Sequence, residues 1–349
     1  MFDGEFAVIL RQLLGIPDTL GTNSATLSPS NLGEKIMVDA TDRAFVGNNH
    51  FGMGYEPTYS GANSLFRRQY SRELDGVDIV AWGVPYDLSV TNRPGCRFGP
   101  RGIRAASTNV AWDGGPWHWG FDPFEKLLMV DYGDCSFDPG FPLDVHDNIY
   151  NEAKSILNSD AFLLTMGGDH SITVPILRAM AEQHGPLSLI QIDAHSDTWE
   201  ENSRRVDHGS MFYHAAKEGI VDAKRSIQAG LRTYNASSHG FNILTAEFVH
   251  EQGVTATVKR IKEVVGDHPT YLTFDIDALD PAFAPGTGTP VCGGLTTWQA
   301  ISLIRRLGGV NLIGADVVEV SPPYDNAEIT ALAGATILLE MTCLFASQK

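Results

Sequence analysis

Acidic and imidazole side chains follow an apolar segment at three places in the chain. The clearest case is QIDAHSDTWEEN, residues 191–202, where Asp193, His195 and Asp197 alternate with other residues directly after the apolar stretch 187–190. Two more segments share the pattern: 161–168 precedes Asp169 and His170, and 270–274 precedes Asp275, Asp277 and Asp280. Aspartate and histidine at such spacings can hold divalent metals and move protons.

The part of the chain that must position these groups alternates strand-like and helix-like segments. Strands are predicted at 77–83, 126–134, 161–168, 187–193, 226–231, 241–246, 270–277 and 311–320. Helices are predicted at 143–157, 173–185, 254–266, 296–309 and 327–347. Apolar strands alternating with amphipathic helices predict an α/β protein with a mostly parallel sheet covered on both faces. A closed barrel and an open doubly wound sheet both fit about eight strands.

The polar groups are expected to converge, because functional side chains in such sheets gather at the carboxyl ends of the strands. Residues i and i+2 of a strand share a face, so Asp193 should point with His195, and Asp275 with Asp277. A single aspartate after a strand is usually a turn cap, but several crowded carboxylates repel one another unless a multivalent cation is present. Six converging groups, four carboxylates and two imidazoles, suit two metals that share carboxylates. Mn²⁺ is favoured, with Ni²⁺, Co²⁺, Fe or Zn²⁺ as alternatives.

Composition excludes several classes of protein. The net charge is −17, from 42 acidic and 25 basic residues, and no basic run exists to neutralise the phosphates of a nucleic acid. The four cysteines form no CxxC pair, which indicates a reducing, cytoplasmic environment. The N-terminus lacks the basic residues of a signal peptide, and no apolar run reaches the ~20 residues of a membrane helix.

Residues 1–75 are rich in Gly, Ser, Asn and Pro, which predicts a loop-rich arm before a catalytic domain at 76–349.

Three motifs resemble those of the ureohydrolases, the arginase and agmatinase family: GGDHS at 167–171, DAHSDT at 193–198 and FDIDALDPAFAPGTGTP at 274–290. The similarity runs from about Val77 to the C-terminus, and the 274–290 segment and EITALAGATILLEM are typical of the agmatinase branch. The resemblance implies a three-layer α/β/α sandwich with an eight-stranded, mostly parallel sheet. It also implies two Mn²⁺ per subunit and assembly as a homotrimer or homohexamer.

The resemblance also implies a role for each ligand candidate. Asp193 and Asp275 would bridge the two metals, with His170 and Asp197 completing one position and His195 and Asp277 the other. Asp169 would either hold a ligand in place or stabilise its own loop. His208, in DHGSMF, corresponds to the family histidine that passes protons to the leaving amine. Glu319, in VVEVSPP, resembles the family glutamate that binds the guanidinium group, whose planar N–H groups a carboxylate fits.

The family hydrolyses a guanidino C–N bond and releases urea, here most simply from agmatine to putrescine, a reaction of polyamine metabolism. Two segments that border the substrate tail depart from the family pattern: TWEENSRRVD, residues 198–207, and the loop with Pro94 and Cys96. An ammonium tail could bind at Trp199, Glu200, Glu201 or Asn202. Arg204 and Arg205 would instead favour a carboxylate tail such as that of 4-guanidinobutanoate.

Other interpretations are the same chemistry on 3-guanidinopropanoate or a biguanide such as metformin, a non-catalytic partner subunit, or a deacetylase-like amide hydrolase. The retention of all six ligand candidates argues against a non-catalytic subunit. The absence of the paired DAHSDT and DIDALD motifs from deacetylases argues against an amide hydrolase.

Overall fold

The computed structural model describes residues 57–349, apart from residues 112–114 and residue 204. Most of the predicted N-terminal arm and Arg204 therefore lie outside the described residues. The described end of the arm packs on the sheet: Leu65 and Phe66 are fully buried, and the backbone N–H of Leu65 donates to Asp131 Oδ2 at 2.7 Å.

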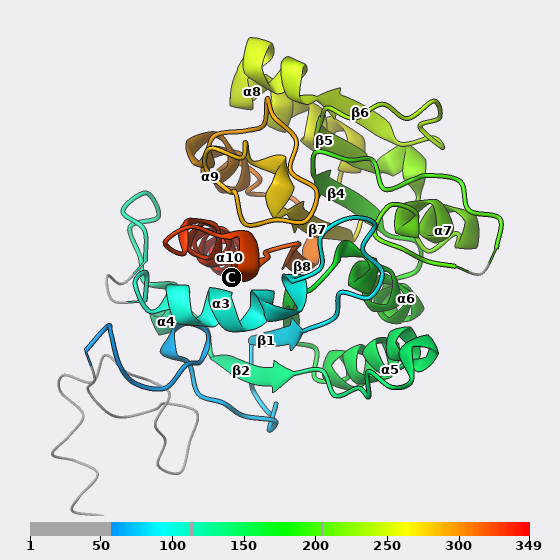
Figure 1. Cartoon of the computed structure of the whole chain (residues 1–349). Coiled ribbons are helices and arrows are strands. Elements are labelled where there is room, and N and C mark those ends of the chain that lie inside the picture. The colour runs from blue at the N-terminus through cyan, green and yellow to red at the C-terminus, as the bar shows by residue number, and fades with distance from the viewer. Residues whose placement is uncertain (1–56, 112–114, 204) are drawn as a thin grey trace, which may run out of the picture. The chain divides into compact units, whose positions relative to one another are not determined.

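One open, eight-stranded sheet forms the centre of the described chain (Figure 1). All neighbouring strands are parallel, in the order β2-β1-β3-β8-β7-β4-β5-β6, so β2 and β6 are the outermost strands and the sheet is not a barrel. The strands are β1 Ile79–Val84, β2 Met129–Asp134, β3 Phe162–Gly167, β4 Ser188–Ile192, β5 Ile227–Leu231, β6 Asn242–Thr245, β7 Thr270–Asp275 and β8 Leu312–Val318. Each lies within a strand predicted from the sequence, except that β1 ends one residue later.

Helices cover both faces of the sheet, which confirms the three-layer sandwich (Figure 1). Helices α3, α8, α9 and α10 share one apolar core with the sheet, and α5, α6 and α7 share the other. The helices are α3 Gly99–Ser107, α4 Pro123–Lys126, α5 Val145–Leu157, α6 Thr173–His184, α7 Met211–Glu218, α8 Ala246–Val265, α9 Thr297–Arg305 and α10 Ile329–Ala346. Strand β1 is apolar throughout for this reason: Ile79 and Ala81 enter the first core, and Val80 and Trp82 the second.

The helices differ from the sequence prediction at four places. Helices α3, α4 and α7 were not indicated; α3 opens on Gly99 and Pro100, which taken alone suggest a loop. Helix α8 begins at Ala246 instead of 254, because Thr245 caps it by accepting a hydrogen bond from the Phe248 N–H. Gly253, with φ of 78°, interrupts α8 just before the segment whose periodicity indicated a helix.

Helix α10 is long and apolar enough to cross a membrane by length and composition alone, with a mean hydropathy of 1.8 over 18 residues. It is instead a core helix, because 78% of it is buried inside the structure. It packs on α3, α9 and β8. Its uniform hydrophobicity therefore reflects burial on nearly all sides.

The order of the central strands brings the sequence motifs together. Strands β3, β8, β7 and β4 are consecutive neighbours, and they precede GGDHS, VVEV, DIDALD and DAHSDT. The chain leaves β3 on one side of the β8–β7 pair and returns as β4 on the other side. Such a reversal opens a crevice at the carboxyl ends of the strands, where α/β proteins bind their ligands.

Gly168 allows the loop after β3 to approach the loop after β1 closely. A Cβ at this position would lie 2.6 Å from the backbone nitrogen of Tyr86 and closer still to its carbonyl oxygen. We expect Gly168→Ala to lower the free energy of unfolding by about 3 kcal/mol or more, because backbone must move to make room. Urea denaturation measures this effect. Gly308→Ala is the matched control, since a Cβ at Gly308 meets no atom within 4 Å; an equal loss in both variants would contradict the prediction.

Candidate metal centre and active site

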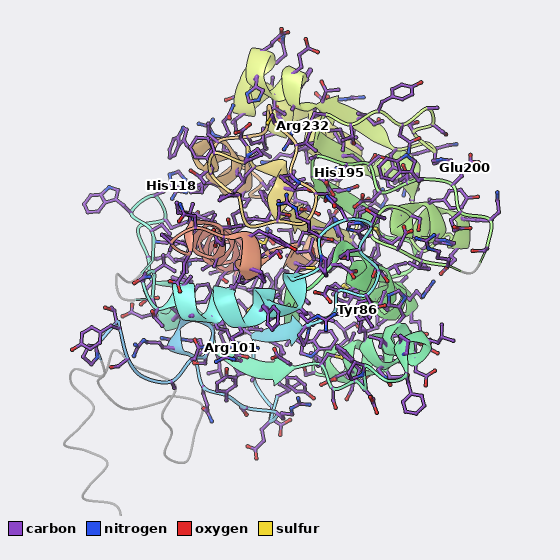
Figure 2. The ribbon with its side chains drawn as sticks, viewed as in Figure 1. Tyr86, Arg101, His118, His195, Glu200 and Arg232 are labelled. Atoms are coloured by element: carbon purple, nitrogen blue, oxygen red, sulfur yellow. The ribbon has the colours of Figure 1, made fainter. Side chains whose placement is uncertain are left out.

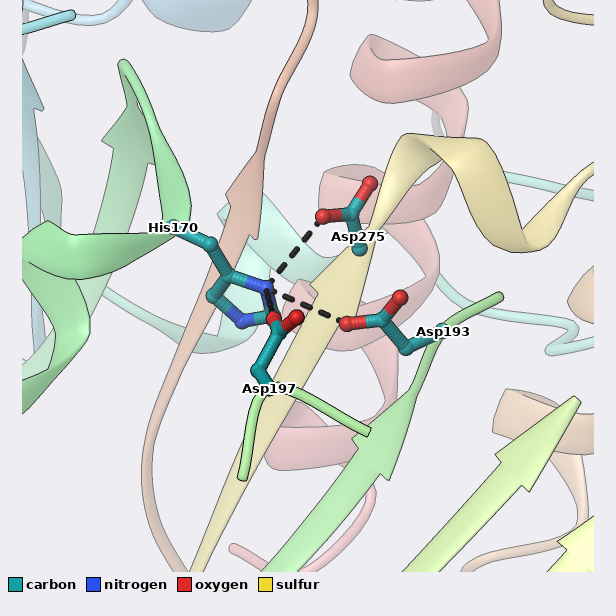
Figure 3. A group of neighbouring side chains, drawn as sticks. All are labelled: His170, Asp193, Asp197 and Asp275. Atoms are coloured by element: carbon teal, nitrogen blue, oxygen red, sulfur yellow. Dashed lines mark ion pairs between the residues drawn. The ribbon is translucent and has the colours of Figure 1, made fainter. Parts of the chain in front are cut away.

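The structure brings all six predicted ligands together in two groups at the strand ends. In the first group, ligand atoms of His170, Asp193, Asp197 and Asp275 lie within 4.8 Å of one another. Figure 3 shows their arrangement, with three carboxylates pointing at one imidazole nitrogen. The second group holds Asp193, His195 and Asp277. Asp193 belongs to both groups, as a bridging ligand would, whereas Asp275 belongs only to the first.

The turns after the strands, and not the alternation of the strands, point these side chains together. The sequence prediction gave strand alternation as the reason why these side chains converge, and that reason is wrong. Strand β4 ends at Ile192, before Asp193, and Asp277 lies in a 3₁₀ turn. At three strand ends an aspartate accepts a hydrogen bond from the N–H two residues later: Asp169 from Ser171, Asp193 from His195, and Asp275 from Asp277. After β4 and β7 these Asx turns fold the chain back, so that His195 and Asp277 join the ligand groups, whereas after β3 the ligand is His170 inside the turn.

The environment of His170 fits a metal ion. Its Nδ1 is buried without a hydrogen-bond partner among the described residues, and it lies 3.2, 3.0 and 3.2 Å from carboxylate oxygens of Asp193, Asp197 and Asp275. Burial raises the pKa of Asp197 to about 7, and the charge of Asp193 adds to this rise. Carboxylates that cannot all be ionised together, around one imidazole nitrogen, form a donor set that a divalent cation would complete.

The second ligand group is more exposed than the first. His195 has a side chain 14% exposed, and its Nδ1 lies 3.0 Å from Asp277 Oδ2 and 3.6 Å from Asp193 Oδ1. Burial works to lower the pKa of His195, but the charges of Asp277 and Asp193 outweigh it and raise the pKa to about 12. At this pKa the His195 ring carries an extra proton. A metal at this position would have to displace the proton before the ring nitrogen could bind the metal.

Three residues that support the ligands were missed by the sequence prediction. Gln191 Nε2 donates to Asp193 Oδ2 at 2.7 Å, and Gln228 Nε2 donates to Gln191 Oε1 at 2.5 Å. Arg232 donates to the backbone oxygen of Asp277 at 2.5 Å, and Figure 2 shows it beside the loops above the central strands. The available signal was a polar glutamine inside each of two otherwise apolar strands, since buried polar groups require partners.

Glu319 and His208 meet beside the first group. Glu319 Oε1 lies 2.9 Å from His208 Nδ1 and also accepts the backbone N–H of His170 at 2.8 Å. Its other oxygen, Oε2, is buried and has no hydrogen-bond partner among the described residues. Glu319 has a left-handed φ of 63°, a conformation that non-glycine residues adopt at a cost and that is enriched in active sites. An unsatisfied carboxylate oxygen beside the cluster suits a cationic N–H donor.

His208 has a neighbour on each side of its ring. Burial works to lower the pKa of His208, but the Glu319 carboxylate outweighs it and raises the pKa to about 9. On the other side, the Thr91 backbone N–H lies 2.8 Å from Nε2, a contact that requires a lone pair there and favours the neutral ring. A neutral ring with its hydrogen on Nδ1 satisfies both contacts, whereas the protonated ring that the raised pKa favours would require the Thr91 amide to turn aside. The Thr91 hydroxyl, at 2.7 Å from Nε2, can then accept the ring N–H.

This pKa predicts a pH dependence. Because the folded-state pKa of His208 exceeds its ordinary value, its protonation stabilises the fold fully below pH ~6.5 and progressively less as pH rises through about 9. Proton donation by His208 should be lost over the same range, giving kcat/KM an alkaline limb near pH 9. His208→Gln should lower kcat/KM by about 10²-fold and remove the limb. A pH–rate profile of both proteins tests this; an unchanged limb in the variant would refute it.

The predicted tail-binding residues lie farther out. Trp199 is 44% exposed and packs against Gly209, where a Cβ would come 2.8 Å from its ring. Glu200 points outward, well away from His195 in Figure 2, with its carboxylate 3.9 Å from His239 Nε2. Asn202 is exposed. In residues 57–349 as described, none of the three shares a hydrogen bond or ion pair with the six ligand candidates.

Other residues from the sequence prediction have structural partners. Asp169 accepts hydrogen bonds from the backbone N–H groups of Ser89 and Ser171, so it stabilises the loop that carries His170. Asp280 accepts from the N–H groups of Ala282, Gly293 and Gly294, and it belongs to neither ligand group. Cys96 is buried, and burial raises the pKa of its thiol.

The fold and this cluster define an α/β protein whose sheet ends in an acidic, histidine-containing cluster of candidate metal ligands. The sequence pattern of the arginase family matches residues 77–343, and the chain belongs to that family. This confirms the resemblance seen in the three motifs.

Curated and solved relatives place the chain on the agmatinase branch. The agmatinase of Chromobacterium violaceum is 54% identical over 301 residues, covering 86% of this chain and 93% of that protein. The crystal structure of a hypothetical agmatinase from Burkholderia thailandensis is 53% identical, with a TM-score of 0.86 and coverage of 88% and 98%. The proclavaminate amidino hydrolase of Streptomyces clavuligerus is 38% identical, with a TM-score of 0.81 and coverage of 84% and 100%.

Proposed function

We propose that this protein is a dinuclear metal-dependent amidinohydrolase that converts agmatine and water to putrescine and urea. The unsatisfied Oε2 of Glu319, buried beside the cluster, carries the proposal. A buried carboxylate oxygen without a partner is costly, and a guanidinium N–H would satisfy it with both charge and hydrogen bond. Agmatinases at 50–54% identity support agmatine as the compound that supplies this group.

The proposed cofactor is a pair of Mn²⁺ ions, with Ni²⁺ and Co²⁺ as alternatives. His170 and Asp197 would hold one ion, His195 and Asp277 the other, and Asp193 and Asp275 would bridge them. When bound, such a pair lowers the pKa of a water molecule and so supplies a nucleophile at neutral pH. Oxygen and imidazole donors without thiolate support this choice of metals.

The chain's own residues would bind the cation and move the proton. Glu319 Oε2 would accept an N–H of the guanidinium group and hold its central carbon toward the metal centre. His208, held at 2.9 Å by Glu319 Oε1, would give its proton to the departing amine nitrogen. The 199–202 loop would receive the tail of the substrate, with Glu200 as the counter-charge for an ammonium group.

The test is urea release from the purified protein loaded separately with Mn²⁺ and Ni²⁺. The panel is agmatine, arginine, 4-guanidinobutanoate, 3-guanidinopropanoate, guanidine and a biguanide such as metformin. The highest kcat/KM is expected on agmatine, and Glu200→Gln should raise KM for agmatine more than for guanidine, which has no tail. Preferred hydrolysis of another compound would overturn the substrate, and no urea from protein with two metals bound would overturn the activity.

A carboxylate-tailed substrate has a specific argument against it. Arg205, the described member of the arginine pair at this loop, already forms an ion pair with Asp207 at 2.9 Å. Its charge is therefore partly neutralised, and its side chain is 65% exposed. An exposed cation of this kind adds little to binding, and the same holds for Glu200, which is 63% exposed, so the ammonium-tailed compound is favoured by the agmatinase relatives and not by the charge of this loop.

The remaining proposals concern assembly and location. We expect a homotrimer or homohexamer, which sedimentation velocity measures directly, and residues 1–75 as an arm of the catalytic domain. A cytoplasmic location is supported by the cysteines, since Cys96, Cys135, Cys292 and Cys343 are all unpaired. The net charge of −17 supports a small cationic substrate and no nucleic-acid partner.

A further inference from the structure

Asp316 is a buried carboxylate in the middle of β8 that has no part in the steps proposed above. The strand register places it between Thr165 of β3 and Thr273 of β7. All three side chains are fully buried. Burying a carboxylate is costly unless hydrogen-bond donors surround it, so its presence in the sheet centre calls for a reason.

The two oxygens of Asp316 have different surroundings. Oδ2 accepts hydrogen bonds from Thr173 Oγ1 at 2.8 Å and from the Tyr271 hydroxyl at 3.0 Å. Oδ1 is buried without a hydrogen-bond partner among the described residues. Burial raises the pKa of Asp316, and the hydroxyl of Thr273 is among the neighbours that lower it in turn. Thr273 and Asp316 are register partners on the neighbouring parallel strands β7 and β8, so their side chains lie on the same face of the sheet, with no hydrogen bond from Thr273 to Oδ1 among the described residues.

Thr273 connects this carboxylate to His170. Its Oγ1 lies 2.7 Å from His170 Nε2, while the opposite ring nitrogen, Nδ1, faces the three carboxylates of the first ligand group. A neutral imidazole has one N–H and one lone pair. If Nδ1 offers its lone pair to a metal, Nε2 carries the hydrogen and donates it to Thr273. The hydroxyl hydrogen of Thr273 is then free to point at Asp316.

We infer that Asp316, acting through the Thr273 hydroxyl, is a positioning residue that holds His170 in the tautomer whose Nδ1 can bind metal. This inference rests on the dinuclear centre proposed above. Histidine ligands whose second nitrogen is held in this way bind metal more tightly, and loss of the partner typically costs about 10–100-fold in metal affinity. Asp316 and Thr273 would thus set the occupancy of the His170 position without touching the ion or the substrate.

The test measures Mn²⁺ binding to the full-length protein in chelator-buffered solutions, independently of urea release. Thr273→Val removes the connecting hydroxyl with little change of shape, and Asp316→Asn removes the charge. Both should weaken one of the two Mn²⁺ sites by about 10–100-fold. Thr165→Val is the matched control. It deletes a buried hydroxyl on β3, the neighbour of β8 on the side away from β7, and should leave both Mn²⁺ affinities unchanged.

A second readout reports the tautomer itself. In ¹⁵N-histidine spectra of the Zn²⁺-loaded protein, His170 should show a protonated Nε2 that is protected from exchange, and Thr273→Val should lose that protection. Equal Mn²⁺ affinity in Thr273→Val and the unaltered protein would overturn the inference, as would an equal loss in Thr165→Val. If the unaltered protein bound no Mn²⁺, the dinuclear centre would fall, and this inference with it. Thr273→Val keeps the test decisive even where Asp316→Asn does not fold.

Discussion

Asp193→Asn is expected to lower kcat/KM for agmatine by at least about 10³-fold, because one substitution weakens both metal positions. Asp193 is shared by the two ligand groups, with Oδ2 at 3.2 Å from His170 Nδ1 and Oδ1 at 3.6 Å from His195 Nδ1. Asparagine keeps the size of the side chain and one oxygen acceptor but removes the charge. Steady-state urea release together with the metal content of the purified variant measures the effect.

Asp280→Asn is the control for this prediction. Asp280 follows the same apolar segment as Asp275 and Asp277, but its carboxylate accepts backbone N–H groups of a neighbouring loop and belongs to neither ligand group. We expect its metal content and kcat/KM to stay within about threefold of the unaltered protein, since its contacts are structural. Near-normal activity of Asp193→Asn with two metals bound would contradict the assignment of Asp193.

Glu319→Gln is expected to lower kcat/KM by about 10²–10³-fold while the metal content stays at two per chain. The substitution leaves the shape of the side chain but removes the charge that faces the cation of the substrate. It also removes the carboxylate that raises the pKa of His208 to about 9, so the alkaline limb of the pH–rate profile should move to lower pH. The two effects together distinguish loss of cation binding from loss of metal.

Glu340→Gln gives the matched comparison, because Glu340 is also a fully buried glutamate. Its oxygens accept hydrogen bonds from Arg305 at 2.5 and 2.9 Å and from the Trp119 indole at 2.7 Å, so its role is structural. This variant should have a lower Tm and an unchanged kcat/KM per folded molecule. If Glu319→Gln kept its activity, or lost it only together with its metals, the guanidinium-binding role would be wrong.

Local sequence was sufficient for the strands and for the identity of the ligand candidates. The central strands lie buried between two helical layers and are therefore largely apolar, which makes them visible without tertiary information, whereas the edge strands β2 and β6 are partly exposed. Helices were harder to predict, because α3 begins with Gly99 and Pro100 and α8 is divided at Gly253. At α3 a local signal for a loop is overridden by packing on the sheet, whereas at Gly253 the backbone does leave helical geometry.

Convergence of the ligands was predicted correctly, but for the wrong reason. Strand alternation suggested that Asp193 points with His195, whereas the structure uses an Asx turn after β4. A two-residue spacing is compatible with both geometries, so the sequence does not distinguish them. The roles of the six ligands, of His208 and of the 199–202 loop still stand as predictions that the experiments above test.

What the sequence determined by itself is the chemistry: aspartate and histidine placed directly after buried strands, and a net charge of −17 that argues against a nucleic-acid partner. What only the tertiary structure decided is which groups meet. Strands β3, β8, β7 and β4 become neighbours across 150 residues of chain, and this order places Glu319 Oε1 at 2.9 Å from His208 and Thr273 at 2.7 Å from His170. Such contacts depend on strand order and register, which no local pattern encodes.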